Sequence, residues 1–197
     1  NWFNIGGKTK IYFKPNSLND LINFLKLYED HKNLFVLGAG SNVLFKDDLF
    51  DGAVIKLSKN FSRISLLNES TIIAGSGALD KSLSDFAMEN SLSGFEFLSC
   101  IPGTIGGGIR MNSGCFESEF KDILISVQAI NRNGVILTIP TKDISFNYRS
   151  CNLPKDLIFL SATFRGKKDN KENIKELIKK LKMKKEKAQP TRIKTGG

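Results

Sequence analysis

The order of apolar and polar positions in the first third of the chain predicts a β-α-β unit. Residues 10–13 form a short apolar run that ends before Pro15 and predict a strand. Apolar side chains then recur at helical spacing after Ser17, a good helix-capping residue: Leu18, Leu21, Ile22 and Leu25. Residues 33–37 predict a buried strand that runs directly into residues 38–42. A small-residue loop therefore follows the carboxyl end of a strand, where open α/β sheets bind their ligands.

Further apolar segments follow in the middle of the chain. Residues 43–45, 53–57 and 70–74 predict strands, and the polar residues 47–52 predict the turn between the first two. A second small-residue loop occupies residues 75–77. Apolar side chains at helical spacing then predict a helix that ends near Asn90: Leu79, Leu83, Phe86 and Ala87.

The second half of the chain has the pattern of an antiparallel sheet. Apolar runs at residues 123–130 and 135–139 are joined by residues 131–134, whose Asn-Gly pair is a strong signal for a hairpin turn. Residues 144–148 and 157–165 predict the remaining strands of this set.

The net charge of +9 comes almost wholly from the end of the chain. Residues 167–197 carry twelve lysines and arginines against four acidic residues, which leaves only +1 for the rest. Apolar side chains line one face of a lysine-rich helix here, which stops before Pro190: Ile174, Leu177, Ile178 and Leu181. Such lysine runs are typical of a solvated helix face, and no aromatic residue interleaves this one, as a single-strand platform requires. A nucleic-acid-binding module is therefore the weakest functional interpretation, and no nucleic-acid partner is expected.

Composition narrows the remaining classes of protein. A chain of 197 residues with 41% hydrophobic content can form one large domain or two small ones. No apolar run is long enough to span a membrane and no signal peptide opens the chain, so we expect a cytoplasmic protein without membrane contact. Cys100, Cys115 and Cys151 lack paired spacing, which indicates a reducing compartment. His31 is the sole histidine, so neither a metal site nor histidine-centred catalysis is expected.

Residues 101–114 contain five glycines and form the most unusual stretch of the chain. Glycine loses more backbone freedom on folding than other residues, so such density favours tight turns or close approach to another group. Thr104 can cap a short helix whose first turn contains glycine, and the N–H groups there would form a cradle for phosphate or a polar ring edge. This stretch alone leaves two interpretations open, a buried turn and a ligand contact.

Residues 38–43 (GAGSNV) invite comparison with the nicotinamide-dinucleotide fingerprint but do not match it. The third glycine of that pattern falls on Val43, and Ser41 and Asn42 lead into a strand-like run instead of a helix. Ser41 and Asn42 can still offer a hydroxyl and an amide group to a pyrophosphate, beside the backbone N–H groups. A simple β-turn is the alternative.

Two arginines are candidates for binding an anion. Arg149 lies between Tyr148 and Ser150 at the end of a predicted strand, where a guanidinium group can bind a carboxylate or stabilise a developing anion. A surface arginine at a strand end is the alternative. Arg110 is expected to make only a contact at the rim of the site.

Several short motifs occur in one fixed order along nearly the whole chain. They are residues 2–7 (WFNIGG), 38–42 (GAGSN), 94–98 (GFEFL), 101–108 (IPGTIGGG), 111–114 (MNSG), 148–150 (YRS) and 189–190 (QP). In combination they resemble the UDP-N-acetylenolpyruvoylglucosamine reductase family, also called UDP-N-acetylmuramate dehydrogenases, which are bacterial cell-wall enzymes. The combination is far more specific than any one motif.

The resemblance implies an α+β fold of the vanillyl-alcohol-oxidase (PCMH) type, in which two subdomains hold FAD between them. The pyrophosphate is then expected against one loop, formed by Gly38, Ala39, Gly40, Ser41 and Asn42. The isoalloxazine ring is expected against a second set: Ile101, Pro102, Gly103, Thr104, Gly106, Gly107, Asn112 and Gly114. No metal is implied.

The resemblance also implies a reaction. In this family NADPH reduces the flavin and leaves, and an enolpyruvyl sugar nucleotide then takes a hydride at its alkene carbon before the enol is protonated. Arg149 occupies the position of the arginine that stabilises the enol, and Tyr148 and Arg149 are expected to contact the substrate. The protein is expected to be a monomer that acts in peptidoglycan synthesis.

The chain departs from the family pattern at its end and at two cysteines. The family's proton-donating serine follows a Gly-Gly pair, and this chain stops there, at Gly196 and Gly197, before the third domain and its catalytic glutamate. We therefore expect the FAD-binding portion of the enzyme, cut at both ends and incomplete by itself; a flavin-binding remnant without reductase turnover is the alternative. The expected parts are two subdomains and the start of a substrate-binding domain: residues 1–60, 61–166 and 167–197. Cys100 and Cys115 replace smaller residues, which bears only on local packing.

Overall fold

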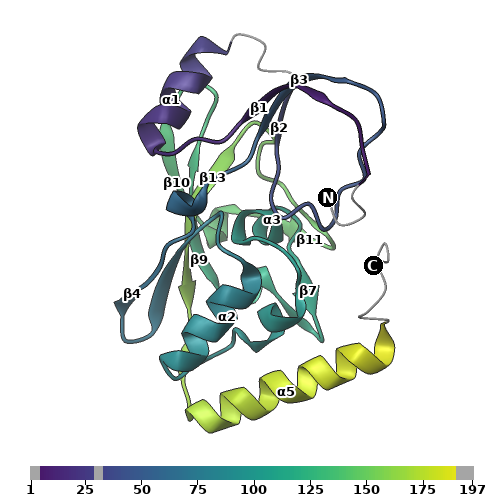
Figure 1. The fold of residues 1–197 in the computed structure, drawn as a ribbon. Helices are drawn as coiled ribbons and strands as arrows, with labels where there is room; N and C mark the ends of the chain where they lie inside the picture. Colours follow the sequence, from purple (N-terminus) through teal and green to yellow (C-terminus); the bar gives the residue numbers. More distant parts are fainter. Residues whose placement is uncertain (1–4, 29–32, 190–197) are drawn as a thin grey trace.

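The structure is a computed structural model that describes residues 5–28 and 33–189 of the chain. Its two larger sheets, one three-stranded and one five-stranded, lie one above the other in the view of Figure 1. Some residues of the expected motifs lie outside the described residues: 2–4, His31, Pro190 and 195–197.

The three-stranded sheet is parallel, with the order β1 (Thr9–Phe13), β3 (Phe50–Ile55) and β2 (Leu34–Val36). Helix α1 (Leu18–Leu27) connects β1 to β2. The backbone N–H of Asp20 donates a hydrogen bond to the Ser17 hydroxyl oxygen at 3.1 Å, which satisfies one of the free N–H groups at the start of the helix. The predicted β-α-β unit and its cap are therefore confirmed.

Three details of this sheet differ from the prediction. Strand β2 is not buried, since Phe35 and Val36 are 36% and 37% exposed. Residues 43–45 form no strand: they are apolar in composition, but no neighbouring strand pairs with them, and the Leu44 side chain is 72% exposed. Strand β3 begins at Phe50, inside the expected turn, and ends at Ile55.

The five-stranded sheet is antiparallel, with the order β10 (Ile136–Pro140), β9 (Leu124–Ile130), β13 (Ile158–Arg165), β5 (Thr71–Gly75) and β4 (Ile64–Asn68). The hairpin between β9 and β10 turns at Asn131–Gly134 as predicted, and Gly134 has a φ of +79° that favours glycine. Residues 144–148 do not join this sheet. Only Phe146–Asn147 (β11) is a strand, and it pairs with Ser150–Cys151 (β12) across a turn formed by Tyr148 and Arg149.

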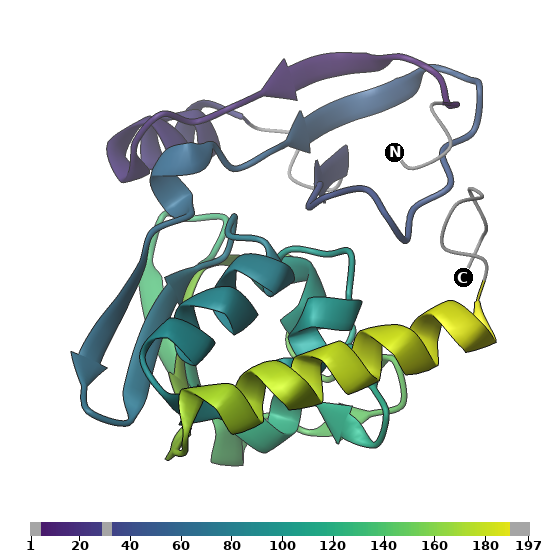
Figure 2. The same ribbon diagram turned by 60° about the horizontal axis from the view of Figure 1, so that its bottom comes forward.

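Helices and short strands connect and cover this sheet, and α2, α3 and α5 lie in front of it in Figure 2. Their bounds are α2 (Asp80–Glu89), α3 (Ile105–Arg110), α4 (Phe120–Ile123), α5 (Lys171–Ala188), η2 (Lys59–Phe61), η3 (Glu96–Cys100), η4 (Thr141–Asp143), β6 (Leu92–Ser93), β7 (Gly114–Cys115), β8 (Ser118–Glu119) and β14 (Lys167–Lys168). No helix in the described part of the chain has the length and apolar character needed to cross a membrane.

Two clusters of buried side chains hold the fold together, and β13 contributes to both. Ile158 and Leu160 pack with Leu21 and Leu25 of α1 in the smaller cluster. Residues such as Phe159 and Phe164 of the same strand pack on the helical side, in the larger cluster. Alternate side chains of a strand point to opposite faces, and a register shift between Phe159 and Ser161 places Phe164 on the same face as Phe159. One strand therefore ties α1 and the three-stranded sheet to the helices on the other face.

Helix α5 packs on the body of the protein through part of its apolar stripe. Ile174 and Ile178 are buried, whereas Leu177 is 43% exposed. The helix contacts α2 and η3, and it runs along the side of the molecule away from the three-stranded sheet (Figures 1 and 2). Its lysines leave it strongly basic on the face that water reaches.

Candidate functional site

The segment 38–42, here called the first glycine loop, follows β2 at the edge of the parallel sheet. The backbone N–H of Leu37 donates to the Ile55 carbonyl oxygen at 2.8 Å, so the loop begins where the strand pairing ends. Gly40 has a φ of +73°, which glycine adopts without strain. The backbone N–H groups of this loop make no hydrogen bond with any residue that the structure describes, so they are available to an anionic group.

The structure brings the first glycine loop against the central glycine-rich segment. A Cβ atom added to Gly38 would lie only 2.6 Å from the Thr104 hydroxyl oxygen. Any side chain at Gly38 would therefore push the two segments apart. This contact joins residues that are far apart in sequence and belong to the two parts of the fold.

Helix α3 confirms part of the expectation for the central segment and corrects the rest. Thr104 stands at the N-cap position as predicted, but its side chain makes no capping hydrogen bond. The N–H groups of Ile105 and Gly106 donate to the carbonyl oxygens of Ala78 and Ser76, both at 2.9 Å. The idea that the N–H groups of this first turn are free to bind phosphate is thus wrong for these two donors.

The glycines of α3 differ in what surrounds them. A Cβ atom at Gly108 would lie 2.2 Å from the Phe120 ring, and one at Gly106 would lie 3.1 Å from Ser76, so packing requires both to be small. A Cβ atom at Gly107 would approach no described atom more closely than 3.5 Å, and Gly107 is exposed. Nothing in the packing of the described residues requires glycine there, whereas the close approach of a flat ring from outside would.

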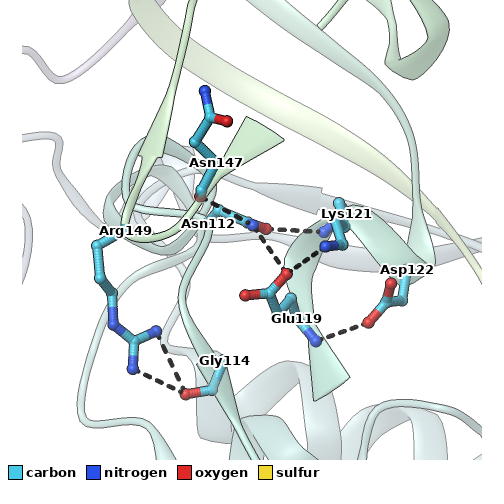
Figure 3. A network of polar contacts seen from close by, with 7 residues as sticks. All are labelled: Asn112, Gly114, Glu119, Lys121, Asp122, Asn147 and Arg149. Carbon is cyan, nitrogen blue, oxygen red and sulfur yellow. Dashed lines mark hydrogen bonds and ion pairs between the residues drawn. The ribbon is translucent and has the colours of Figure 1, made fainter. Parts of the chain in front are cut away.

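Asn112 lies behind the site, not on its surface. It is fully buried, has a φ of +39°, and its side-chain amide donates to Glu119 Oε2 at 3.1 Å and to the Asn147 carbonyl oxygen at 3.4 Å. Its Oδ1 accepts the Lys121 backbone N–H at 3.2 Å. Figure 3 shows this side chain at the centre of the network. The expectation that Asn112 contacts the cofactor is therefore replaced by a supporting role.

Glu119 and Lys121 complete this network. The Lys121 ammonium group lies 2.6 Å from Glu119 Oε2 and is the main reason why the pKa of Glu119 is below its usual value. Glu119 and Asp122 also form a reciprocal capping box at the start of α4, in which the Glu119 N–H donates to Asp122 at 2.8 Å. The sequence pattern had not singled out these residues, although the Glu-x-x-Asp spacing is a recognisable capping signal.

Arg149 lies on an exposed turn beside a surface pocket of about 330 Å³ lined by residues 114–119, Tyr148 and Arg149 itself. Its φ is +55°, an unusual conformation for a side-chain-bearing residue. Both terminal nitrogens lie 3.5 Å from the Gly114 carbonyl oxygen (Figure 3), and the guanidinium lies 5.1 Å from the centre of the Tyr148 ring. These contacts are long, so the guanidinium group is available to a stronger anionic partner.

Arg110 is a structural residue, and the expectation of a rim contact is wrong. Its guanidinium donates to the carbonyl oxygens of Leu153 and Leu157, both at 2.8 Å, and to that of Pro154 at 3.1 Å. It also lies 4.2 Å from the centre of the Phe159 ring. Burial lowers its pKa. The sequence could not reveal this role, because the acceptors lie more than 40 residues away.

The two facing glycine segments and the α+β architecture define the class of this protein. The chain belongs to the FAD-binding domain family, whose model, described as "FAD binding domain", matches residues 9–140. These residues include both glycine-rich segments. The predicted α+β FAD-binding fold of the PCMH type is confirmed.

Particular relatives share one name. The chain is 60% identical over 197 residues to the UDP-N-acetylenolpyruvoylglucosamine reductase of Pelagibacter ubique (strain HTCC1062), and 42% identical over 196 residues to that of Rickettsia canadensis (strain McKiel). It is matched over its whole length and spans 65% and 66% of these relatives. The crystal structure of UDP-N-acetylenolpyruvylglucosamine reductase (MurB) from Thermus caldophilus is similar with a TM-score of 0.83 and 28% identity, covering 94% of this chain and 65% of that one. The resemblance inferred from the motifs is confirmed.

Proposed function

We propose that this chain forms the FAD-binding part of a UDP-N-acetylenolpyruvoylglucosamine reductase, which reduces the enolpyruvyl sugar nucleotide to UDP-N-acetylmuramate with NADPH as the hydride donor. The observation that carries the proposal is the first glycine loop, whose N–H groups have no partner among the described residues, packed against Thr104 beside the exposed Gly107. The relatives named above, similar over the whole of this chain, support the substrate.

The residues present fit FAD. The first glycine loop offers its backbone N–H donors, together with the Ser41 hydroxyl and the Asn42 amide, to the pyrophosphate. The open surface at Gly107 suits the flat flavin ring, and Ile101, Pro102 and Gly114 of the same glycine-rich segment are proposed to contact it as well. We divide the chain at residue 60, because residues 1–60 and 61–166 would hold opposite sides of the cofactor. Residues 167–197 would lead toward the substrate.

FAD, when bound, supplies the hydride chemistry, and the protein's own groups hold the substrate and stabilise charge. Arg149 carries an exposed guanidinium group with only long contacts to Gly114, so it can turn to bind a carboxylate or the enol oxygen that gains negative charge. Tyr148, 82% exposed, can pack against the substrate from the same turn. Asn112 holds this turn in place through the carbonyl oxygen of Asn147.

The test adds FAD, NADPH and the substrate in turn and follows the absorbance spectrum of the flavin. Apoprotein titrated with FAD should bind it and show the shifted spectrum of a protein-bound flavin. NADPH added without oxygen should bleach that spectrum, and the enolpyruvyl sugar nucleotide should restore it in a chain extended to the length of the relatives. Failure to bind FAD would contradict the proposal, whereas bleaching without recovery would support the alternative of a flavin-binding protein without reductase turnover. A monomer in the cytoplasm, the proposed state, is checked by sedimentation of the loaded protein and by cell fractionation.

A further inference from the structure

Asp80, the first residue of α2, is a buried carboxyl group that the proposed mechanism does not use. It is fully buried, and neither of its oxygens has a hydrogen-bond partner in the structure. The hydroxyl oxygens of Ser76 and Ser84 are likewise buried and have no hydrogen-bond partner among the described residues. An unpaired ionised carboxylate in such surroundings is very unfavourable, whereas an uncharged acid is tolerated and keeps one O–H donor.

This carboxyl group lies directly behind the loop formed by residues 101–104. A Cβ atom added to Gly103 would lie 2.5 Å from Asp80 Oδ2, and the Asp80 backbone N–H donates to the Gly103 carbonyl oxygen at 3.1 Å. Leu79 and Thr104 form an isolated β-bridge beside this contact. On the far side, Thr104 fills the space in front of Gly38. Loop 101–104 is therefore held between Asp80 behind it and the first glycine loop in front of it.

We propose that Asp80 is a positioning residue for FAD: its uncharged carboxyl group supports loop 101–104 from behind, and its ionisation weakens the binding of the cofactor. The inference rests on the proposed placement of FAD against this loop and the first glycine loop. A negative charge at Asp80 would be desolvated, would have no partner, and would oppose the approach of an anionic pyrophosphate through a low-dielectric layer. Asp80 is fully buried, so it acts through the loop and does not touch the cofactor.

The groups around Asp80 do not compensate its charge. Loop 101–104 carries no titratable side chain, and the elements packed against α2 are η3, β6 and α5. Their titratable groups, with those of α2 itself, are Lys81, Asp85, Glu89, Glu96, Cys100, Lys171 and the other lysines and glutamates of α5. Burial raises the pKa of Asp80 from 3.8 to about 8 and is the sole cause of the shift within the described structure.

Two pH dependences follow from this state. Between about pH 4 and pH 8 the folded chain holds a proton that the unfolded chain has lost, so rising pH favours unfolding, by about tenfold per unit in the unfolding equilibrium constant. Above about pH 8 the free protein ionises, whereas FAD binding favours the protonated form. The dissociation constant of FAD should then rise by up to about tenfold per pH unit.

The experiment compares the unmodified protein with Asp80→Asn, which is uncharged and similar in shape. Asp85→Asn, at a half-buried position of the same helix, is the matched control. Urea unfolding of the apoprotein at pH 5, 6, 7 and 8 should show the tenfold dependence in the unmodified protein and in Asp85→Asn, and its loss in Asp80→Asn. The FAD dissociation constant, measured by flavin fluorescence from pH 6 to pH 9.5, should rise above pH 8 in the first two proteins only.

Different results of this experiment would contradict different parts of the proposal. Unfolding that depends equally on pH in all three proteins would show that Asp80 is not a neutral buried acid. A matched rise in the FAD dissociation constant in Asp80→Asn would remove the positioning role. Absence of FAD binding at every pH contradicts the proposed function instead, while the unfolding result still decides the state of Asp80. If Asp80→Asn does not fold, titration of carboxyl-labelled aspartates by ¹³C NMR in the unmodified protein tests the same point: an Asp80 that ionises near pH 4 refutes the inference.

Discussion

The side-chain amide of Asn112 donates a hydrogen bond to the backbone carbonyl oxygen of Asn147 at 3.4 Å and so joins the segment after α3 to the turn that carries Arg149 (Figure 3). The two residues are 35 positions apart in sequence. Asn112 therefore connects the proposed cofactor surface with the turn that carries the proposed anion-binding arginine. Disturbing it should affect both the fold and the placement of Arg149.

Asn112→Ala should lower the free energy of unfolding by about 2–3 kcal/mol, because it removes the three hydrogen bonds that the buried Asn112 amide makes with Glu119, Lys121 and Asn147. Alanine also tolerates a φ of +39° less well than asparagine. Urea denaturation measures the change. Asn133→Ala, at an exposed turn position where the side chain makes no hydrogen bond among the described residues, should change stability by less than about 0.5 kcal/mol. Equal losses in the two variants would contradict the supporting role.

Adding a side chain at two neighbouring glycines should have opposite effects on stability and on FAD binding. Gly107→Val should leave the unfolding free energy within about 1 kcal/mol, because the position is exposed and the added Cβ atom would make only an ordinary contact with Thr104, at 3.5 Å, but it should abolish FAD binding. Gly108→Ala should destabilise the fold by about 1–3 kcal/mol, because its Cβ atom would overlap the Phe120 ring. Flavin fluorescence titration and thermal unfolding of both variants separate the effects. Full FAD occupancy in a folded Gly107→Val protein would remove the flavin from this surface.

The two candidate arginines form a second contrasting pair. Arg110→Ala should lower the unfolding free energy by about 2–4 kcal/mol, since three carbonyl oxygens lose a charged donor and Phe159 loses its partner. Arg149→Ala should change it by less than about 0.5 kcal/mol, because its described contacts are long and exposed. Chemical denaturation of both variants gives the comparison. A large loss of stability in Arg149→Ala would indicate a structural role instead.

Arg149→Ala should also slow hydride delivery to the sugar nucleotide by about 10²–10³-fold while leaving the bound-flavin spectrum unchanged, because the lost group is proposed to stabilise the enol and not to hold FAD. The measurement is single-turnover reoxidation of pre-reduced flavin by the substrate, in a chain extended to the length of the relatives. Arg149→Lys should recover only part of the rate, since lysine cannot bind two oxygens in the planar arrangement of a guanidinium group. Undiminished reoxidation by Arg149→Ala would contradict the assigned role.

Features set by neighbouring residues were predictable from sequence. The cap at Ser17 and the turn at Asn131–Gly134 depend on groups within a few positions, and both are confirmed. The apolar run at 43–45 was misread as a strand, because composition does not show whether a neighbouring strand is present to pair with it.

The same distinction applies to the site. Glycine density marked both loops, because backbone conformation and close approach are local demands. The roles of Asn112 and Arg110 depend on acceptors 35 to 47 residues away, and the burial of Asp80 depends on loop 101–104. No local pattern encodes such contacts, so these residues were misassigned or passed over.

The attachment of α5 to the body supplies the last prediction. Ile178 is buried whereas its neighbour Leu177 is 43% exposed. Replacing each by alanine therefore compares a buried with an exposed position on the same helix. Ile178→Ala should lower the unfolding free energy by about 2–3 kcal/mol, because it removes buried methyl groups and leaves a cavity against the larger part of the fold. Leu177→Ala should cost less than about 1 kcal/mol. Amide hydrogen exchange across residues 171–188 should accelerate markedly in Ile178→Ala and little in Leu177→Ala, since α5 is held mainly by its buried stripe and its many lysines repel one another. Fast exchange throughout α5 in the unmodified protein would contradict packing of this helix on α2 and η3.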